Sequence, residues 1–245
     1  MLGIPTVRDR IVLQAMKRIL EPMVEPKMSP NSFAFRPNRG AHDALRKVQR
    51  ALIRGQTFVF ETDIKKYFNS INHQYLAKTI RQTSEQFAAS QLFKESLKMS
   101  DSWIIRSKLG IAQGSPLSPL LANIFLMKFD DDISKSLPDS TLFRYADDMI
   151  LLCIDQRQAE LGGAEIESQL SNLKLMIHPI KTRITNASRD AFVFLGFEIT
   201  TKSVQPSKQN IHKLRTAIRR AVSKRRKISA DKRLEMLTPV IRSFA

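Results

Sequence analysis

LFRYADDMILLCI, residues 142–154, is the stretch that decides the fold of this chain. Two apolar segments, 142–145 and 149–154, are separated only by ADD, and this pattern predicts a β-hairpin with two adjacent carboxylates at its tip. The flanking residues favour burial, whereas Asp147 and Asp148 resist it, because neighbouring negative charges in a partly desolvated place raise each other's pKa. Unpaired buried charges cost several kcal/mol. A positive partner is therefore expected at the tip of the hairpin.

A third acid ends another apolar segment. Residues 57–64 read TFVFETDI, which is rich in β-branched and aromatic residues and predicts a strand that ends near Asp63; KKYF follows at 65–68. An Asp-Asp pair alone more often forms a solvated turn. In a basic chain, however, several strand-end acids are typical of a site in which carboxylates hold divalent cations against a phosphate chain.

Acids in this arrangement indicate a two-metal site. Mg²⁺ prefers oxygen ligands and is usually bound by one or two carboxylates together with water and substrate phosphates. Two such ions, about 3.5–4 Å apart, would activate an attacking 3′-hydroxyl and stabilise a departing pyrophosphate. The predicted reaction is nucleotidyl transfer.

The composition points to a polyanionic partner. The chain has 245 residues with 40 Lys+Arg against 23 Asp+Glu, which gives a formal net charge of +17. Its 42% hydrophobic content supports a sizeable core and excludes a disordered tail. The single cysteine, Cys153, excludes an internal disulfide and a cysteine zinc cluster. With no secretory leader pattern and no apolar run near the roughly 20 residues that cross a bilayer, a cytoplasmic location without a membrane partner is expected.

Positive charge concentrates at the end of the chain. Residues 202–245 contain 13 Lys+Arg but only two acids, Asp231 and Glu235. Apolar residues recur at helical spacing from Ile211 to Val222, and the cations lie mostly on the other sides, which predicts an amphipathic helix. A solvated surface helix is the plain alternative. The scarcity of acids favours phosphate contact instead.

Helical and strand patterns alternate along the rest of the chain. Strands are predicted at residues 57–64, 103–109 and 192–200 besides the hairpin. Helices are predicted at residues 10–20 (ending near Pro22), 43–54, 74–97, 165–176 and from 118 to 129, where Ser118 would be the N-cap and Pro119 the first helical residue.

These elements carry an ordered set of motifs. YADD at 145–148 is preceded by QGSPLSPLLAN at 113–123 and by DIKKYF at 63–68, and the flanking blocks are GIPTVRDR (3–10), SFAFRP (32–37), KT (181–182) and FLGF (194–197). The set resembles a reverse transcriptase of the bacterial group II intron type and covers nearly the whole chain. A lone YXDD motif is weak evidence, but five or more blocks in order are strong evidence.

The resemblance implies an α+β, right-handed polymerase fold, with an antiparallel palm sheet backed by helices, partial fingers and a basic helical thumb. The expected parts are partial fingers (1–55), palm (56–74), fingers helices (75–108), palm (109–200) and a truncated basic thumb (201–245). The family normally has a Lys and an Arg before the GIP block that clamp the triphosphate. Here they would precede residue 1, so a second polypeptide could supply the missing fingers segment.

The resemblance also assigns roles to single residues. Asp63, Asp147 and Asp148 would be catalytic and would hold two Mg²⁺ ions, or Mn²⁺, together with the Ile64 carbonyl. The nucleotide-binding residues would be Ile64, Phe68, which rejects a 2′-hydroxyl by bulk, Gln113 and Gly114 against the nucleotide, and Lys181 at the triphosphate. The template- or primer-binding residues would be Arg36, Tyr145, Leu195, Gly196, Lys213, Arg219 and Arg220. Smaller departures from the family pattern are Ala112, Asn69 and Asn72.

The implied function is RNA-directed DNA polymerase activity on an RNA template, with a DNA or RNA primer and deoxynucleoside triphosphates. One alternative is an RNA-binding, maturase-like remnant with weak or no polymerase activity. Another is an RNA-templated RNA polymerase or a non-templated transferase of the same palm type. Intact acids favour the polymerase, whereas the absent clamp favours the remnant.

Overall fold

The computed structural model describes residues 5–98, 108–222 and 229–242. The chain divides into two compact units, residues 1–186 and 187–245. The strand predicted at 103–109 falls mainly outside the described residues. No helix in the described ranges is long and apolar enough to cross a membrane.

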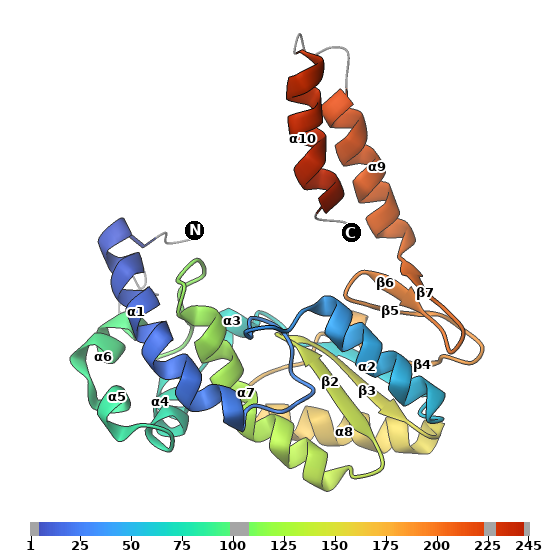
Figure 1. The fold of residues 1–245 in the computed structure, drawn as a ribbon. Coiled ribbons are helices and arrows are strands. Elements are labelled where there is room, and N and C mark those ends of the chain that lie inside the picture. Colours follow the sequence, from blue (N-terminus) through green and yellow to red (C-terminus); the bar gives the residue numbers. More distant parts are fainter. Residues whose placement is uncertain (1–4, 99–107, 223–228, 243–245) are drawn as a thin grey trace. The chain divides into compact units, whose positions relative to one another are not determined.

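A four-stranded antiparallel sheet forms the centre of the first unit (Figure 1). Its strands, in spatial order, are β2 (Thr141–Tyr145), β3 (Asp148–Cys153), β1 (Phe58–Asp63) and β4 (Arg183–Asn186). The β2–β3 pair confirms the predicted hairpin. The fold class is confirmed too, because an antiparallel sheet is combined with many helices.

Helices cover both faces of this sheet (Figure 1). On one face α8 (Gln156–Asn172) packs so closely that a Cβ on Gly163 would lie 2.5 Å from the Phe60 ring. On the other face, α2 (Ala41–Ile53) lies over β2 and β3 and buries its own apolar side. Because side chains alternate along a strand, Phe60 and Asp63 point to opposite faces.

The remaining α-helices of the first unit build its core with the sheet. They are α1 (Val7–Val24), α3 (Tyr67–Ser70), α4 (His73–Arg81), α5 (Glu85–Ala89), α6 (Gln91–Lys98) and α7 (Ser118–Ser136). Two short 3₁₀ helices, η1 (Glu25–Lys27) and η3 (Pro179–Lys181), bury no residue. The central helix is α7, whose residues from Leu120 to Leu126 are all buried.

Two helix ends differ from the sequence predictions. Pro22 lies inside α1, which continues to Val24, because full burial of Leu20 and Val24 holds the last turn despite the missing N–H. Ser118 is the first residue of α7 and not its N-cap. Its hydroxyl donates to the Ala112 carbonyl at 2.7 Å, so it fastens the preceding loop.

Three predicted elements have different extents. The helix predicted at 74–97 is three helices, because Ser84 and Ser90 are extended and the Ser84 hydroxyl caps the next helix. The helix predicted at 165–176 runs instead from Gln156 to Asn172 as α8, because Gly162 and Gly163 leave room for the side chains of Leu151 and Phe60 from the sheet. The strand predicted at 192–200 is two strands with a turn between them.

The second unit combines a small sheet with two helices. Its strands are β5 (Phe192–Phe194), β6 (Phe197–Ile199) and β7 (Val204–Pro206), and its helices are α9 (Lys208–Val222) and α10 (Ala230–Arg242). The basic amphipathic helix predicted from the sequence is confirmed as α9. Lys213, Arg219 and Arg220 are all exposed on it.

Candidate active site

Strand register brings the predicted acids to one end of the sheet. Asp63, the last residue of β1, pairs with Asp148, the first residue of β3. Asp147 lies in the two-residue turn that joins β2 to β3, and its carbonyl accepts a hydrogen bond from the Ile64 N–H at 3.2 Å. Residues that are distant in sequence therefore meet at one end of the sheet.

The acids disturb each other's protonation. Burial, and then the negative charges of Asp63 and Asp147, raise the pKa of Asp148 to about 7. Burial also raises the pKa of Asp147, and the nearby Asp63 carboxylate adds to this effect. Both shifts have the same direction because each carboxylate loses water and gains a like-charged neighbour. The site therefore favours an added cation.

Lys181 provides one positive charge. Its Nζ donates to Asp63 Oδ2 at 2.6 Å, and this hydrogen bond raises the pKa of Lys181. The His178 N–H also donates to the Asp63 carbonyl at 2.8 Å, while the Lys181 N–H donates to the His178 carbonyl at 2.9 Å. The segment around η3 is thus tied to Asp63 through both main chain and side chain.

Arg144 supports the hairpin turn, and sequence reasoning missed it. Its side chain is 1% exposed, and Nε and Nη2 donate to Asp130 at 2.8 and 2.6 Å. Nη1 donates to Asn123 Oδ1 at 3.1 Å and to the Ala146 carbonyl at 3.0 Å. Ala146 has a φ of 59°, a strained value for a residue other than glycine. The available signal was an arginine inside an apolar strand, because buried charges almost always have partners.

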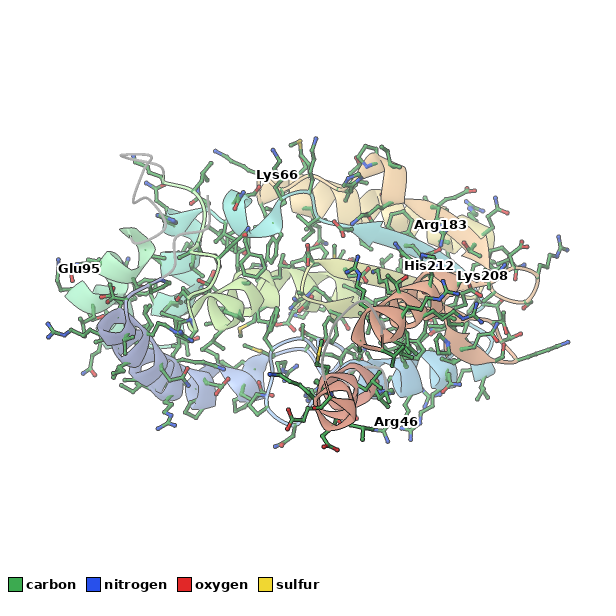
Figure 2. The ribbon with its side chains drawn as sticks, turned by 90° about the horizontal axis from the view of Figure 1, so that it is seen from above. Arg46, Lys66, Glu95, Arg183, Lys208 and His212 are labelled. Atoms are coloured by element: carbon green, nitrogen blue, oxygen red, sulfur yellow. The ribbon has the colours of Figure 1, made fainter. Side chains whose placement is uncertain are left out.

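A fourth carboxylate lies behind the site. Glu61 is buried two residues before Asp63, on the same face of β1. Arg183 on the edge strand β4 (labelled in Figure 2) donates to it through Nε at 2.7 Å and Nη2 at 2.9 Å. Glu61 contributes to the raised pKa of Asp148. Sequence reasoning did not identify this pair either.

The predicted nucleotide-binding residues of the first unit lie on connected segments. Phe68 is half-buried and packs edge-to-face on Tyr67, with ring centroids 5.8 Å apart. Its carbonyl accepts a hydrogen bond from the Ile111 N–H at 2.9 Å. Gln113 is exposed and donates to Asn69 at 3.3 Å, so the QGSP loop is joined to α3. Gly114, beside it, has a φ of 100° and open space around its missing Cβ.

Arg36 is placed differently from the template contact that was predicted. Its side chain is 2% exposed and forms an ion pair with Glu25. Nη1 donates to the carbonyls of Ser29 and Ser32 at 2.6 and 2.8 Å. The structure therefore gives Arg36 a role in holding the turn that follows α1, because its donors point into the protein. Tyr145, in contrast, is half-buried beside the acids as the register partner of Asp148.

The other predicted primer contacts belong to the second unit. Leu195 and Gly196 form the β5–β6 turn, with φ values of 52° and 81°. The Gly196 carbonyl accepts hydrogen bonds from Asn210 Nδ2 and from the Ser207 N–H, so this turn seats the start of α9. A Cβ on Gly196 would lie 2.1 Å from Asn210 Nδ2, so packing within the unit is enough to explain why this position is a glycine.

The acids suit a metal that is shared with substrate. In the ranges that the structure describes, no three acidic, histidine or cysteine side chains converge into a ligand group for a metal ion. Magnesium sites that act on phosphates usually take one or two carboxylates and complete the shell with water and phosphate. Hard carboxylate oxygens with raised pKa values at Asp147 and Asp148 fit such a site.

Comparisons with known proteins agree with this geometry. A family model described as "Reverse transcriptase (RNA-dependent DNA polymerase)" matches residues 1–199. Protein YkfC of Escherichia coli (strain K12) is 31% identical over 241 residues, which cover 82% of this chain and 63% of YkfC. Group II intron-encoded protein LtrA of Lactococcus lactis subsp. cremoris is 39% identical over 132 residues, which cover 53% of this chain and 22% of LtrA. The chain thus spans less than two thirds of the length of these curated relatives.

Solved structures share the fold. A telomerase from Candida albicans, in complex with a TWJ fragment of telomeric RNA, superposes with a TM-score of 0.62 at 15% identity, covering 95% of this chain and 46% of that chain. Apo telomerase from Candida tropicalis gives a TM-score of 0.57 at 13% identity, covering 98% of this chain and 49% of that chain. At such low identity the likeness establishes the architecture alone.

Proposed function

The chain belongs to the reverse transcriptase (RNA-dependent DNA polymerase) family, in the group II intron type, and we propose that it is an RNA-directed DNA polymerase. It would add deoxynucleotides to the 3′-hydroxyl of a DNA or RNA primer on an RNA template. The observation that carries the proposal is the register pairing of Asp63 with Asp148, next to Asp147 in the hairpin turn.

The acids would act as ligands. Asp63, Asp147 and Asp148, with the Ile64 carbonyl, would hold divalent cations, Mg²⁺ or Mn²⁺, which when bound activate the primer hydroxyl and stabilise the leaving pyrophosphate. The chain itself supplies the positioning. The β1–β3 register holds two acids face to face, and Arg144 fixes the turn that carries the third. Pre-positioned charge of this kind provides much of the rate enhancement in phosphoryl transfer.

Four further residues would recognise the nucleotide. The Lys181 side chain is 56% exposed and bonds only one oxygen of Asp63, so its ammonium can turn toward a triphosphate and donate a proton to the departing pyrophosphate. Phe68 would lie under the sugar and exclude a 2′-hydroxyl. Gln113 and Gly114 would line the same place from the loop before α7.

A primer-extension assay tests the proposed function. The full chain is given an RNA template, a labelled primer, deoxynucleoside triphosphates and Mg²⁺, and Asp147→Ala is expected to remove extension while RNA binding is retained. Asp139→Ala is the matched control, because Asp139 is exposed at the far end of β2. Extension by Asp147→Ala at the normal rate would contradict the metal assignment. RNA binding without extension by the unaltered chain would favour the maturase-like alternative.

A further inference from the structure

The turn between η1 and α2 is fastened to the strand that leads into the catalytic hairpin. The Phe33 N–H donates to the Arg144 carbonyl and the Arg144 N–H to the Asn31 carbonyl, both at 3.0 Å. Asn123 Nδ2 donates to the Ala34 carbonyl at 2.7 Å. Since Arg144 also holds the Ala146 carbonyl, one hydrogen-bond network links this turn to the turn that carries Asp147.

Phe35 projects from this anchored turn into solvent. It is 46% exposed, and among the residues that the structure describes no other phenylalanine, tyrosine or tryptophan is exposed to this degree. Its φ of 60° is a left-handed conformation that a bulky residue rarely adopts. An apolar ring held outward at a conformational cost indicates a ligand for its face, because such strain persists mainly where function requires it.

Cations crowd beside the same turn. Lys47 Nζ and Arg39 Nη1 donate to a single oxygen, the Pro30 carbonyl, at 2.7 and 2.8 Å. Arg50 is exposed on α2 and follows Lys47 by one helical turn, so the two side chains lie on the same side of the helix. Burial, and then the positive charges of Arg39, Arg36 and Arg50, lower the pKa of Lys47.

Acids offset only part of this charge. The Glu25 carboxylate pairs mainly with the Arg36 guanidinium, and the distance from its Oε1 to Arg39 Nε is 3.9 Å. Asp43 pairs with Arg46, which projects outward from α2 (Figure 2). Arg39, Lys47 and Arg50 therefore keep a surplus of positive charge, and a phosphate chain would offset it.

We propose that Phe35, Arg39, Lys47 and Arg50 form a binding surface for single-stranded nucleic acid. An unpaired base would stack on the Phe35 ring while Arg39, Lys47 and Arg50 contact the phosphates that flank it. Exposed aromatic rings beside a cationic track are the usual means of holding single strands, because a duplex offers no free base face. The inference deepens the proposed function, since the strand held here would be the unpaired part of the RNA template.

Binding measurements without metal test the surface separately from catalysis. Fluorescently labelled, unstructured RNA is titrated with the full chain in EDTA, next to an RNA hairpin of equal length whose loop is replaced by a non-nucleotide linker, so that all of its bases are paired. Phe35→Asn is the central variant, because asparagine tolerates a left-handed backbone and should leave the free energy of unfolding unchanged or higher. It is expected to bind the single strand roughly tenfold more weakly and the hairpin normally. Leu92→Asn, at another exposed apolar residue, is the matched control.

Salt dependence tests the cations. Lys47→Gln and Arg50→Gln should each reduce the slope of log affinity against log salt by about 0.7 for single-stranded RNA. Lys78→Gln on α4 is the control and should leave the slope unchanged. The surface assignment would be overturned by unchanged single-strand binding in Phe35→Asn, or by equally weakened binding of the single strand and the hairpin. If single-strand binding weakens as expected but the unaltered chain never extends a primer, the surface stands and the proposed polymerase function fails.

Discussion

Asp63 at the end of β1 and Asp148 at the start of β3 are register partners in the antiparallel sheet. Side chains directly opposite each other in such a sheet have Cβ atoms about 4.5–5.5 Å apart. The two carboxylates are thus held together by the backbone ladder, and a slip of one residue would turn one of them to the other face. The proposed catalytic geometry is therefore a property of strand register as much as of residue identity.

The first prediction concerns stability against pH. The pKa of Asp148 in the folded protein is about 7, above the ordinary aspartate value of 3.8, so the folded state retains this proton more strongly than the unfolded state. The stability from this proton is fully present below about pH 4 and is lost as the pH rises toward 7. In EDTA, Asp148→Asn should therefore be more stable than the unaltered chain at pH 8, by up to about 4 kcal/mol, and nearly equal at pH 4.

Urea denaturation at both pH values measures this difference. Using the difference between the two proteins removes the contributions of other titrating groups, which they share. Added Mg²⁺ should narrow the gap at pH 8, because a bound cation offsets the repulsion. A gap of the same size at pH 4 and pH 8 would show that neither burial nor the neighbouring acids raise the pKa of Asp148 in the folded state.

The second prediction separates stability from positioning in the Arg144 network. Asp130→Ala leaves a buried guanidinium without its partner and should cost about 3–5 kcal/mol. The double variant Asp130→Leu with Arg144→Met removes both charges and should recover most of that loss. The rate of primer extension by the double variant should nevertheless be much lower than that of the unaltered chain, because Arg144 no longer donates a hydrogen bond to the Ala146 carbonyl.

The matched control lies on the same helix. Asp132 forms an exposed pair with Lys128 on α7, and Asp132→Ala should cost less than about 1 kcal/mol. Denaturation midpoints and extension rates are measured for all variants. Normal extension by the double variant would show that Arg144 serves stability alone.

The hairpin could be predicted from sequence because its pattern is local: two apolar runs flank a polar turn within 13 residues of chain. The ends of helix α8 could not be predicted in this way, because Gly162 and Gly163 look like a helix break in the sequence. Only the structure shows that they make room for the side chains of Leu151 and Phe60. The Arg144–Asp130 pair and the Phe35 surface are also long-range features, set by how a strand, a helix and a turn meet. Arg36 is the opposite case. Its place in a family motif predicted a contact with the template, whereas in the structure its side chain is buried and pairs with Glu25.

The third prediction concerns choice of sugar. If Phe68 lies under the incoming sugar, Phe68→Ala should raise incorporation of ribonucleotides relative to deoxynucleotides, because the side chain no longer meets the 2′-hydroxyl. Competition between the two nucleotide types in the extension assay measures the ratio. Phe87→Ala, at another half-buried phenylalanine, is the control for general loosening of the core. An unchanged ratio in Phe68→Ala, with activity retained, would remove Phe68 from the nucleotide site.

The fourth prediction concerns α9, which carries no acidic residue from Lys208 to Val222. Its exposed cations should release counterions from nucleic acid, so affinity should fall steeply with salt. Changing Lys213, Arg219 and Arg220 together to glutamine should lower the slope of log affinity against log salt by about 0.7–0.9 for each phosphate that is no longer neutralised. Lys232→Gln on α10 is the control, because α10 carries the two acids Asp231 and Glu235 among its cations, whereas α9 carries none. A triple variant with the slope of the unaltered chain would show that this face of α9 meets something other than a phosphate backbone.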